Sequence, residues 1–193
     1  MVLVHGGFWR REWSRDTMES LAVDLTRRGF ATWNIEYRRF GVGGAWPGSG
    51  HDVVTAIDFS PQLGLAADRV ILVGHSAGGY LALWASGRTR LPVVTTVALA
   101  PIVDLEDIAS SEAEGAGEAR DLLDRGAPSP VSPADPGHTL AVHGSNDEYV
   151  PSTHSRELAA VGTDLVPFEG GHFAVLDPRQ PHWEQVLADL RVL

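Results

Sequence analysis

The sequence of 193 residues contains no cysteine and no lysine, and each absence removes a class of chemistry. Without cysteine, the chain has no disulfide framework, no thiolate metal site and no cysteine nucleophile. Without lysine, it forms no Schiff base with a carbonyl substrate and lacks the lysine of a nucleotide-binding P-loop. All 15 basic residues are therefore arginines.

Long apolar runs and positive charge are also scarce. No run reaches the roughly 20 apolar residues of a membrane-spanning helix, and the chain does not open with the cationic and apolar segments of a signal peptide. We therefore expect a cytoplasmic protein that has no membrane partner. The formal net charge of −10 argues against nucleic acid as a partner.

The remaining composition is typical of one soluble domain, with 44% hydrophobic and 21% charged residues. Short apolar runs predict strands at residues 1–4, 30–35, 70–73, 93–99, 139–142 and 164–168. Helical spacing or context predicts helices at residues 14–29, 51–59, 77–86, 112–123, 152–160 and 182–190. The alternation predicts an α/β fold with a mostly parallel sheet of about six strands, covered by helices on both faces.

We expect a single domain over residues 1–193. Residues 104–136 change in character, because they are rich in Glu, Asp, Ala, Gly, Ser and Pro. We interpret this segment as a short cap-like insertion that contains one helix. An insertion of this size gives only a minimal cap, so the site should be open.

One hexapeptide, Gly74-His75-Ser76-Ala77-Gly78-Gly79, stands between an expected strand and an expected helix. This is the G-x-S-x-G pattern in the context of strand, sharp turn and helix that lifts a serine hydroxyl off the sheet. The glycines leave room for the tight turn, and the helix N-terminus favours developing negative charge. The pattern predicts Ser76 as a nucleophile.

A serine hydroxyl needs a base, commonly a histidine that a carboxylate orients. His172 follows two glycines directly after the last expected strand, and Asp147 follows the strand before it. These residues give the chain order Ser, Asp, His. Three other acids remain alternatives to Asp147, of which we rank Asp104 second. The alternatives are Glu148, Asp104 and Glu169.

The transition state of acyl transfer needs fixed N–H donors for its oxyanion. We expect one from Ala77, the residue after the serine, and a second from the glycine loop after the first strand, at Gly7 or Phe8. Four aromatic residues near the same rim are candidates for substrate binding, although core packing explains them equally well: Trp9, Trp46, Tyr80 and Phe173. We find no metal constellation and expect no cofactor, since His138 and His143 only flank a strand.

Several of these motifs resemble those of one superfamily. His5-Gly6-Gly7-Phe8-Trp9 resembles the H-G-G-x-W signature of kynurenine formamidase-like hydrolases and related esterases of the α/β-hydrolase superfamily. The segment 143–151 is similar to the acid loop of prolyl-oligopeptidase-type and esterase relatives, and His172-Phe173 is similar to their histidine loop.

The resemblance implies a serine hydrolase with a Ser76–His172–Asp147 triad that cleaves small carboxylic esters or aryl formamides. It therefore implies a small-molecule ester or amide as the substrate. Two alternatives stay open: a short-peptide hydrolase of prolyl-oligopeptidase type, and a non-catalytic binding protein with the same fold.

The chain also departs from the superfamily's pattern. Two further strands normally precede the H-G-G strand, which here begins at Met1. We expect either that the start of the gene is misplaced or that the protein has a minimal sheet of six parallel strands. The strand at 30–35 would then be an open edge, which is a liability for association. We expect a partner chain, as in a homodimer, or a loop to cover this edge.

Overall fold

The computed structural model describes residues 1–41, 44–65, 68–112, 114–130 and 137–192. Its sheet has six strands in the order β2-β1-β3-β4-β5-β6, and every neighbouring pair is parallel. The strands are β1 (Val2–Val4), β2 (Trp33–Ile35), β3 (Val70–His75), β4 (Val93–Leu99), β5 (His138–Gly144) and β6 (Asp164–Phe168). The expected α/β fold with a parallel sheet is confirmed.

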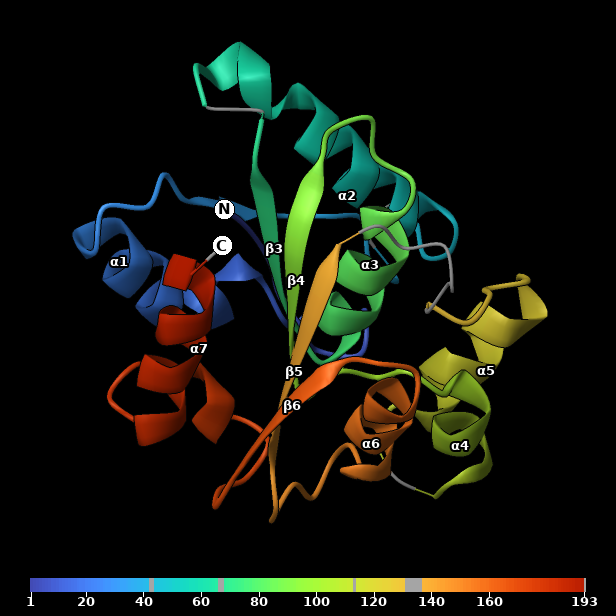
Figure 1. The fold of residues 1–193 in the computed structure, drawn as a ribbon. Helices are drawn as coiled ribbons and strands as arrows, with labels where there is room; N and C mark the ends of the chain where they lie inside the picture. The colour runs from blue at the N-terminus through green and yellow to red at the C-terminus, as the bar shows by residue number, and fades with distance from the viewer. Residues whose placement is uncertain (42–43, 66–67, 113, 131–136, 193) are drawn as a thin grey trace.

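Helices cover both faces of the sheet (Figure 1). α1 and α7 lie on one face, α2, α3 and α6 lie on the other, and α4 and α5 pack together beside α6. The α-helices are α1 (Glu19–Arg27), α2 (Gly48–Phe59), α3 (Ala77–Ser86), α4 (Leu105–Ser110), α5 (Ala116–Asp124), α6 (Thr153–Ala160) and α7 (Pro181–Val192). Short 3-10 turns are η1 (Arg15–Met18), η2 (Ser60–Leu63) and η3 (Ala174–Leu176).

The central strands β3 and β4 are mostly apolar because helices bury both of their faces. Every residue of β3 is buried, and so is all of α3, which packs on it. On the opposite face, α1 and α7 contribute Leu21, Leu25, Trp183 and Leu187, each with no exposed surface, to a second core cluster. Burial on both sides holds the central strands, and with them the loops at their carboxyl ends, in one place.

Glycines let α3 approach the sheet closely at the turn that follows β3. A Cβ added to Gly74 would lie 2.3 Å from the carbonyl oxygen of Gly78, inside the turn. A Cβ added to Gly78 would lie 2.1 Å from the carbonyl oxygen of Val4 and 2.4 Å from that of His5. The contact atoms belong to backbone, so neither position has room for a side chain.

Gly78→Ala should therefore lower the free energy of unfolding by about 3 kcal/mol, as overpacking against immobile atoms does. Gly117→Ala is the matched control, because Gly117 lies in α5 with no atom within 4 Å of an added Cβ. That change should stabilise the protein by about 0.5 to 1 kcal/mol through helix propensity. Urea unfolding of both variants measures the difference, and equal effects would contradict the close approach of α3 to β1.

The expected element positions agree closely where the pattern is strong. The segments at 77–86, 93–99 and 164–168 coincide with α3, β4 and β6. β2 is shorter than expected and begins only at Trp33. The insertion contains two helices rather than one, because Asp104 accepts hydrogen bonds from the N–H groups of Glu106 and Asp107 and so caps α4. Residues 131–136 of the insertion lie outside the described residues.

β2 forms one edge of the sheet. Within the described ranges it pairs only with β1, from Val2 beside Trp33 to Val4 beside Ile35. The side-chain amide of Asn34 in β2 donates to the carbonyl of Arg15 at the start of η1. Coverage of this edge by a second chain, as in a homodimer, stays a prediction.

Candidate active site

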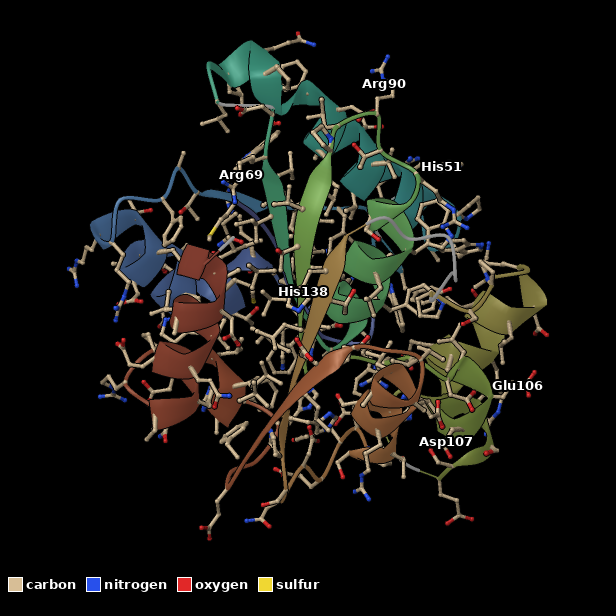
Figure 2. All side chains as sticks on the ribbon, viewed as in Figure 1. His51, Arg69, Arg90, Glu106, Asp107 and His138 are labelled. Carbon is tan, nitrogen blue, oxygen red and sulfur yellow. The ribbon has the colours of Figure 1, made fainter. Side chains whose placement is uncertain are left out.

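The predicted site residues gather at the carboxyl ends of the strands. Ser76 follows β3, Asp147 and His172 come after β5 and β6, and Gly7 follows β1. Figure 2 labels Arg69 and Arg90 at the other end of the sheet, where β3 and β4 begin. Ligand sites of parallel α/β sheets lie at the carboxyl ends, so the topology brings segments far apart in sequence to one rim.

Ser76 stands in a strained turn. Its φ of 54° and ψ of −118° lie in a region that non-glycine residues rarely adopt. Its N–H donates to the carbonyl of Leu99, and its own carbonyl accepts the N–H groups of Gly79, Tyr80 and Ile102. The surrounding backbone thus holds the serine in the geometry expected of a nucleophile elbow.

Asp147 and His172 are in direct contact. His172 Nδ1 lies 2.7 Å from Oδ2 of Asp147, and the two side chains are 3% and 1% exposed. The other carboxylate oxygen accepts the N–H groups of Tyr149 at 2.9 Å and Val150 at 2.8 Å. Because the carboxylate accepts from Nδ1, Nε2 of His172 is left unprotonated and free to act as a base.

The environment of Asp147 keeps it ionised. Burial alone would raise its pKa, but hydrogen bonds from His143, His172 and the Val150 N–H outweigh burial and hold the pKa well below its usual range. Of the three alternative acids, Asp104 caps α4, Glu148 is exposed with an oxygen 3.0 Å from a Cβ built on Gly171, and Glu169 is exposed. Of these four acids, Asp147 is the one in contact with His172.

His75 connects the serine turn to the histidine loop. Its Nε2 lies 3.1 Å from the carbonyl oxygen of His172, and the two rings are 4.7 Å apart. Burial, together with the neighbouring His172, lowers the pKa of His75 to about 3. The ring is therefore neutral over the physiological range and donates one hydrogen bond to the backbone of the loop.

His75→Gln should make folding less sensitive to acid, because Gln keeps a donor for the carbonyl of His172 but does not titrate. Between the ordinary pKa of 6.5 and the folded value of about 3, only the unfolded chain binds a proton at His75. Stability is therefore present above 6.5 and falls as pH drops through this window, by about 1.4 kcal/mol per pH unit for one proton. Urea unfolding between pH 4 and 7 should show a shallower slope for the variant, and parallel slopes would contradict a neutral buried His75.

The glycine loop after β1 lies against the serine turn. A Cβ on Gly6 would be 2.9 Å from Cβ of Ser76, so only glycine permits this approach. Nδ1 of His5 contacts the carbonyl oxygen of Gly6 at 2.7 Å. Since a trans peptide points its C=O and N–H in opposite directions, the N–H of Gly7 faces away from His5.

The two residues after Gly6 adopt left-handed backbone conformations, with φ of 105° at Gly7 and 50° at Phe8. Ala77 is the first residue of α3, so its N–H has no partner within the helix. The three predicted oxyanion donors thus come from the glycine loop and from the serine turn against which it packs.

Ser76 and His172 line one small cavity of about 20 Å³. Its walls are mainly aromatic, and the rings of Trp13 and Phe173 stack with centroids 5.6 Å apart. The lining residues are Gly7, Phe8, Trp13, His75, Ser76, Glu114, Tyr149, His172 and Phe173. The cavity thus combines the predicted nucleophile and base with part of the glycine loop.

The four aromatic candidates for substrate binding separate into two groups. Phe173 lines the cavity and is 41% exposed. Trp9, Trp46 and Tyr80 are at most 7% exposed and belong to a core cluster, and the Tyr80 hydroxyl donates to the carbonyl of Pro128. For these three residues the structure shows packing rather than a place in the cavity wall.

Sequence reasoning missed four side chains of the cavity wall: Trp13, His75, Glu114 and Tyr149. Tyr149 stands two residues after Asp147, in the same acid-loop motif, and could have been predicted from it. Trp13 reaches the cavity because the chain turns after Trp9. Glu114 belongs to the insertion, where its ion pair with Arg10 at 2.6 Å ties it to the glycine loop. The sequence around Glu114 contains no pattern that predicts this ion pair with Arg10.

Two kinds of site are not found within the described ranges. No group of three or more histidine, aspartate or glutamate side chains there is arranged to hold a metal ion. None of the helices in the same ranges is long and apolar enough to cross a membrane.

Solved structures with the same fold include three esterases. The chain is 21% identical to a phosphonate-inhibited esterase B from Lactobacillus rhamnosis. The match covers 99% of this chain and 73% of that one, with a TM-score of 0.78. A lipase/esterase from Lactobacillus plantarum is 18% identical, and the match covers 100% of this chain and 84% of that one with a TM-score of 0.76. A truncated carbohydrate esterase from gut microbiota is 21% identical over 99% and 84%, with a TM-score of 0.77.

Family comparisons cover most of the sequence. Residues 1–91 match the BD-FAE family, and residues 47–166, more than half of the chain, match the prolyl oligopeptidase family. No protein of curated function matches the chain. The second match includes the serine turn and the segment that carries Asp147. The chain therefore belongs to the prolyl oligopeptidase family, within the α/β-hydrolase superfamily of serine hydrolases.

Proposed function

We propose that this protein hydrolyses small carboxylic esters through an acyl-enzyme on Ser76. The observation that carries the proposal is the contact of His172 Nδ1 with buried Asp147 at 2.7 Å, in a histidine that lines one cavity with Ser76. This arrangement supplies a nucleophile, a base of fixed tautomer and a carboxylate that stays ionised.

In the first half of the reaction, Nε2 of His172 takes the proton of the Ser76 hydroxyl as its oxygen attacks the ester carbonyl carbon. The carbonyl oxygen becomes an oxyanion, for which the N–H groups of Ala77 and of Gly7 or Phe8 are the proposed donors. The bond to the leaving oxygen then breaks, and His172 returns the proton so that an alcohol departs.

In the second half, His172 takes a proton from water, and the hydroxide oxygen attacks the acyl carbon. The bond to Ser76 breaks, the serine regains the proton from His172, and a carboxylic acid leaves. Asp147 keeps its charge throughout and stabilises the imidazolium that forms twice in each cycle.

The small cavity favours a short acyl group. The cavity beside Ser76, of about 20 Å³, is small, and ring side chains close it on several sides. The fold neighbours named as esterases support an ester substrate. An aryl formamide has a formyl group, the smallest acyl group, and is the narrower candidate that the H-G-G-x-W motif favours.

A short peptide is the second candidate substrate, and membership of the prolyl oligopeptidase family favours it. Peptide cleavage requires the same attack on a carbonyl, but His172 must protonate a poorer leaving amine. Substrate choice then depends on the walls of the cavity rather than on the triad.

Four substrates measured side by side test the proposal: p-nitrophenyl acetate, p-nitrophenyl octanoate, N-formylkynurenine and glycyl-prolyl-p-nitroanilide. We expect turnover of the acetate well above that of the octanoate. Turnover of N-formylkynurenine far above that of the acetate would identify the enzyme as a formamidase. Turnover of the anilide alone would identify it as a peptidase. Folded protein that turns over none of the four would contradict the proposal.

A further inference from the structure

A second histidine contacts the carboxylate of Asp147. His143 stands near the end of β5, and its Nε2 lies 3.3 Å from Oδ2 of Asp147, the same oxygen that contacts His172. Its side chain is 2% exposed. His172 faces the cavity, whereas His143 is not among the residues that line it. His143 takes no part in the proposed reaction steps.

The hydrogen bonds of His143 fix its tautomer. Nε2 also lies 3.0 Å from the carbonyl oxygen of Val150, so both groups facing this nitrogen are acceptors and Nε2 carries the proton. Nδ1 lies 2.7 Å from Oγ of Ser155, a fully buried residue of α6. The Ser155 hydroxyl therefore donates to Nδ1, and the ring donates from Nε2.

Three hydrogen-bonded steps thus connect α6 to the predicted base. They run from Ser155 to His143, from His143 to Asp147, and from Asp147 to His172. All the side chains involved are buried, where hydrogen bonds are strong and fixed in direction. Val150 attaches the loop 144–151 to the middle of this path, because its N–H donates to Asp147 and its carbonyl accepts from His143.

We infer that His143 is a positioning residue, which divides the hydrogen-bonding capacity of Asp147 Oδ2 between itself and His172. This inference rests on the proposed function of His172 as the base. An oxygen that accepts two N–H donors is a weaker acceptor for each of them than an oxygen that accepts one. His143 thereby limits how strongly Asp147 stabilises the imidazolium form of His172.

The direction of the effect follows from the charge. Without the His143 donor, Asp147 would interact more strongly with the charged form of His172, so His172 would bind its proton up to a higher pH. The acidic limb of the profile of kcat/KM against pH would move upward with it. Substrate binding would not change, because His143 does not line the cavity.

Other ionisable groups also lie near Asp147 and His172, and they must be the same in all the proteins that are compared. His75 contacts His172 from the serine turn, and the ring of Tyr149 is 5.3 Å from that of His172. Glu114 lines the cavity, and Glu148 lies beside Gly171. Substitutions at His143 leave all of these residues in place.

The test compares His143→Phe, which has no donor, with His143→Gln, whose amide nitrogen can take the place of Nε2. Because His143→Phe also removes the contacts that hold Asp147 and Val150 in place, we expect its kcat to fall about 10-fold with KM unchanged. This loss is smaller than the roughly hundredfold loss caused by a displacement of about 1 Å. Its acidic limb should move upward by about half a pH unit. His143→Gln should restore both values towards those of the wild type.

Titration of the His172 ring by NMR reads the same effect without any substrate. The His172 resonance is assigned by its loss in His172→Gln, and its midpoint should rise in His143→Phe but not in His143→Gln. If the wild type hydrolyses none of the tested substrates, the proposed function fails, while this titration still decides the role of His143.

His154→Gln is the matched control, because His154 is a buried histidine like His143 but lies on α6 and bonds to Val103, Asp104 and Asp107. Figure 2 shows Asp107 on α4, away from the sheet. This change should lower the melting temperature without moving the His172 midpoint. An unchanged His172 midpoint in folded His143→Phe, or an equal change in His143→Gln and His143→Phe, would overturn the inference.

Discussion

Ser76→Ala should lower kcat for p-nitrophenyl acetate by about a millionfold, which is the scale of losing the nucleophile of a serine hydrolase. The reason is that no other step replaces the covalent intermediate: the oxyanion donors and the base remain, but the base has no hydroxyl to activate. Initial rates at saturating ester, corrected for the uncatalysed reaction, measure the loss.

The fold should survive this change. Alanine has the same backbone preferences as serine at the strained φ of 54°, and the described residues show no hydrogen bond from the Ser76 hydroxyl. Ser145→Ala serves as the control, because Ser145 is an exposed serine of the acid loop outside the cavity, and its variant should keep full activity. Wild-type turnover by folded Ser76→Ala protein would remove Ser76 from the mechanism.

A phosphonate ester offers an independent measurement of the same residue. Attack by the Ser76 oxygen on phosphorus should expel the leaving group and add the phosphonyl mass to the wild-type protein. The Ser76→Ala protein should keep its original mass, and a modified peptide other than the one that contains Ser76 would point to a different nucleophile.

The sheet and the turn at Ser76 were predictable because their signals are local. The elbow needs small residues at fixed offsets, and Gly74 and Gly78 occupy them where the structure leaves no space for a Cβ. The apolar run of a strand buried on both faces is also recognisable from the sequence alone, which explains the agreement at β4.

The helix α4 was not predictable in the same way. From the sequence, Asp104 is only an alternative catalytic acid at a strand end, because a helix of six residues gives too little periodicity to predict the helix that Asp104 caps. In the structure its carboxylate accepts two backbone N–H groups, which settles its role as a cap.

The cavity wall depended on contacts across the chain. Trp9 and Phe8 are neighbours with similar side chains, but Trp9 packs edge-on against Tyr80 in the core while Phe8 reaches the cavity. Both have positive φ, so a turn rather than a strand divides them between the two environments. The contact between His143 and Asp147 likewise depends on the path of loop 144–151, which cannot be predicted from the spacing of the two residues in the sequence.

Asp147→Asn should lower kcat by about 10,000-fold, the scale of the same change in a Ser-His-Asp triad. An amide nitrogen in place of Oδ2 is a donor, so Nδ1 of His172 has to become an acceptor. The proton of His172 then stands on Nε2, where it blocks removal of the Ser76 proton. The loss should appear in kcat at every pH, because in the wild type hydrogen bonds already keep the pKa of Asp147 far below neutrality.

Two matched variants test two of the acids, Asp104 and Glu148, that the sequence left as alternatives to Asp147. Asp104→Asn removes a charge but keeps a good cap for α4, and Glu148→Gln removes an exposed charge beside the histidine loop. Both should retain activity close to that of the wild type, because neither carboxylate contacts His172. A loss in either variant as large as that of Asp147→Asn would reassign the acid. Equal activity of all four proteins would mean that His172 needs no carboxylate, and that the buried Asp147–His172 contact only holds the loop.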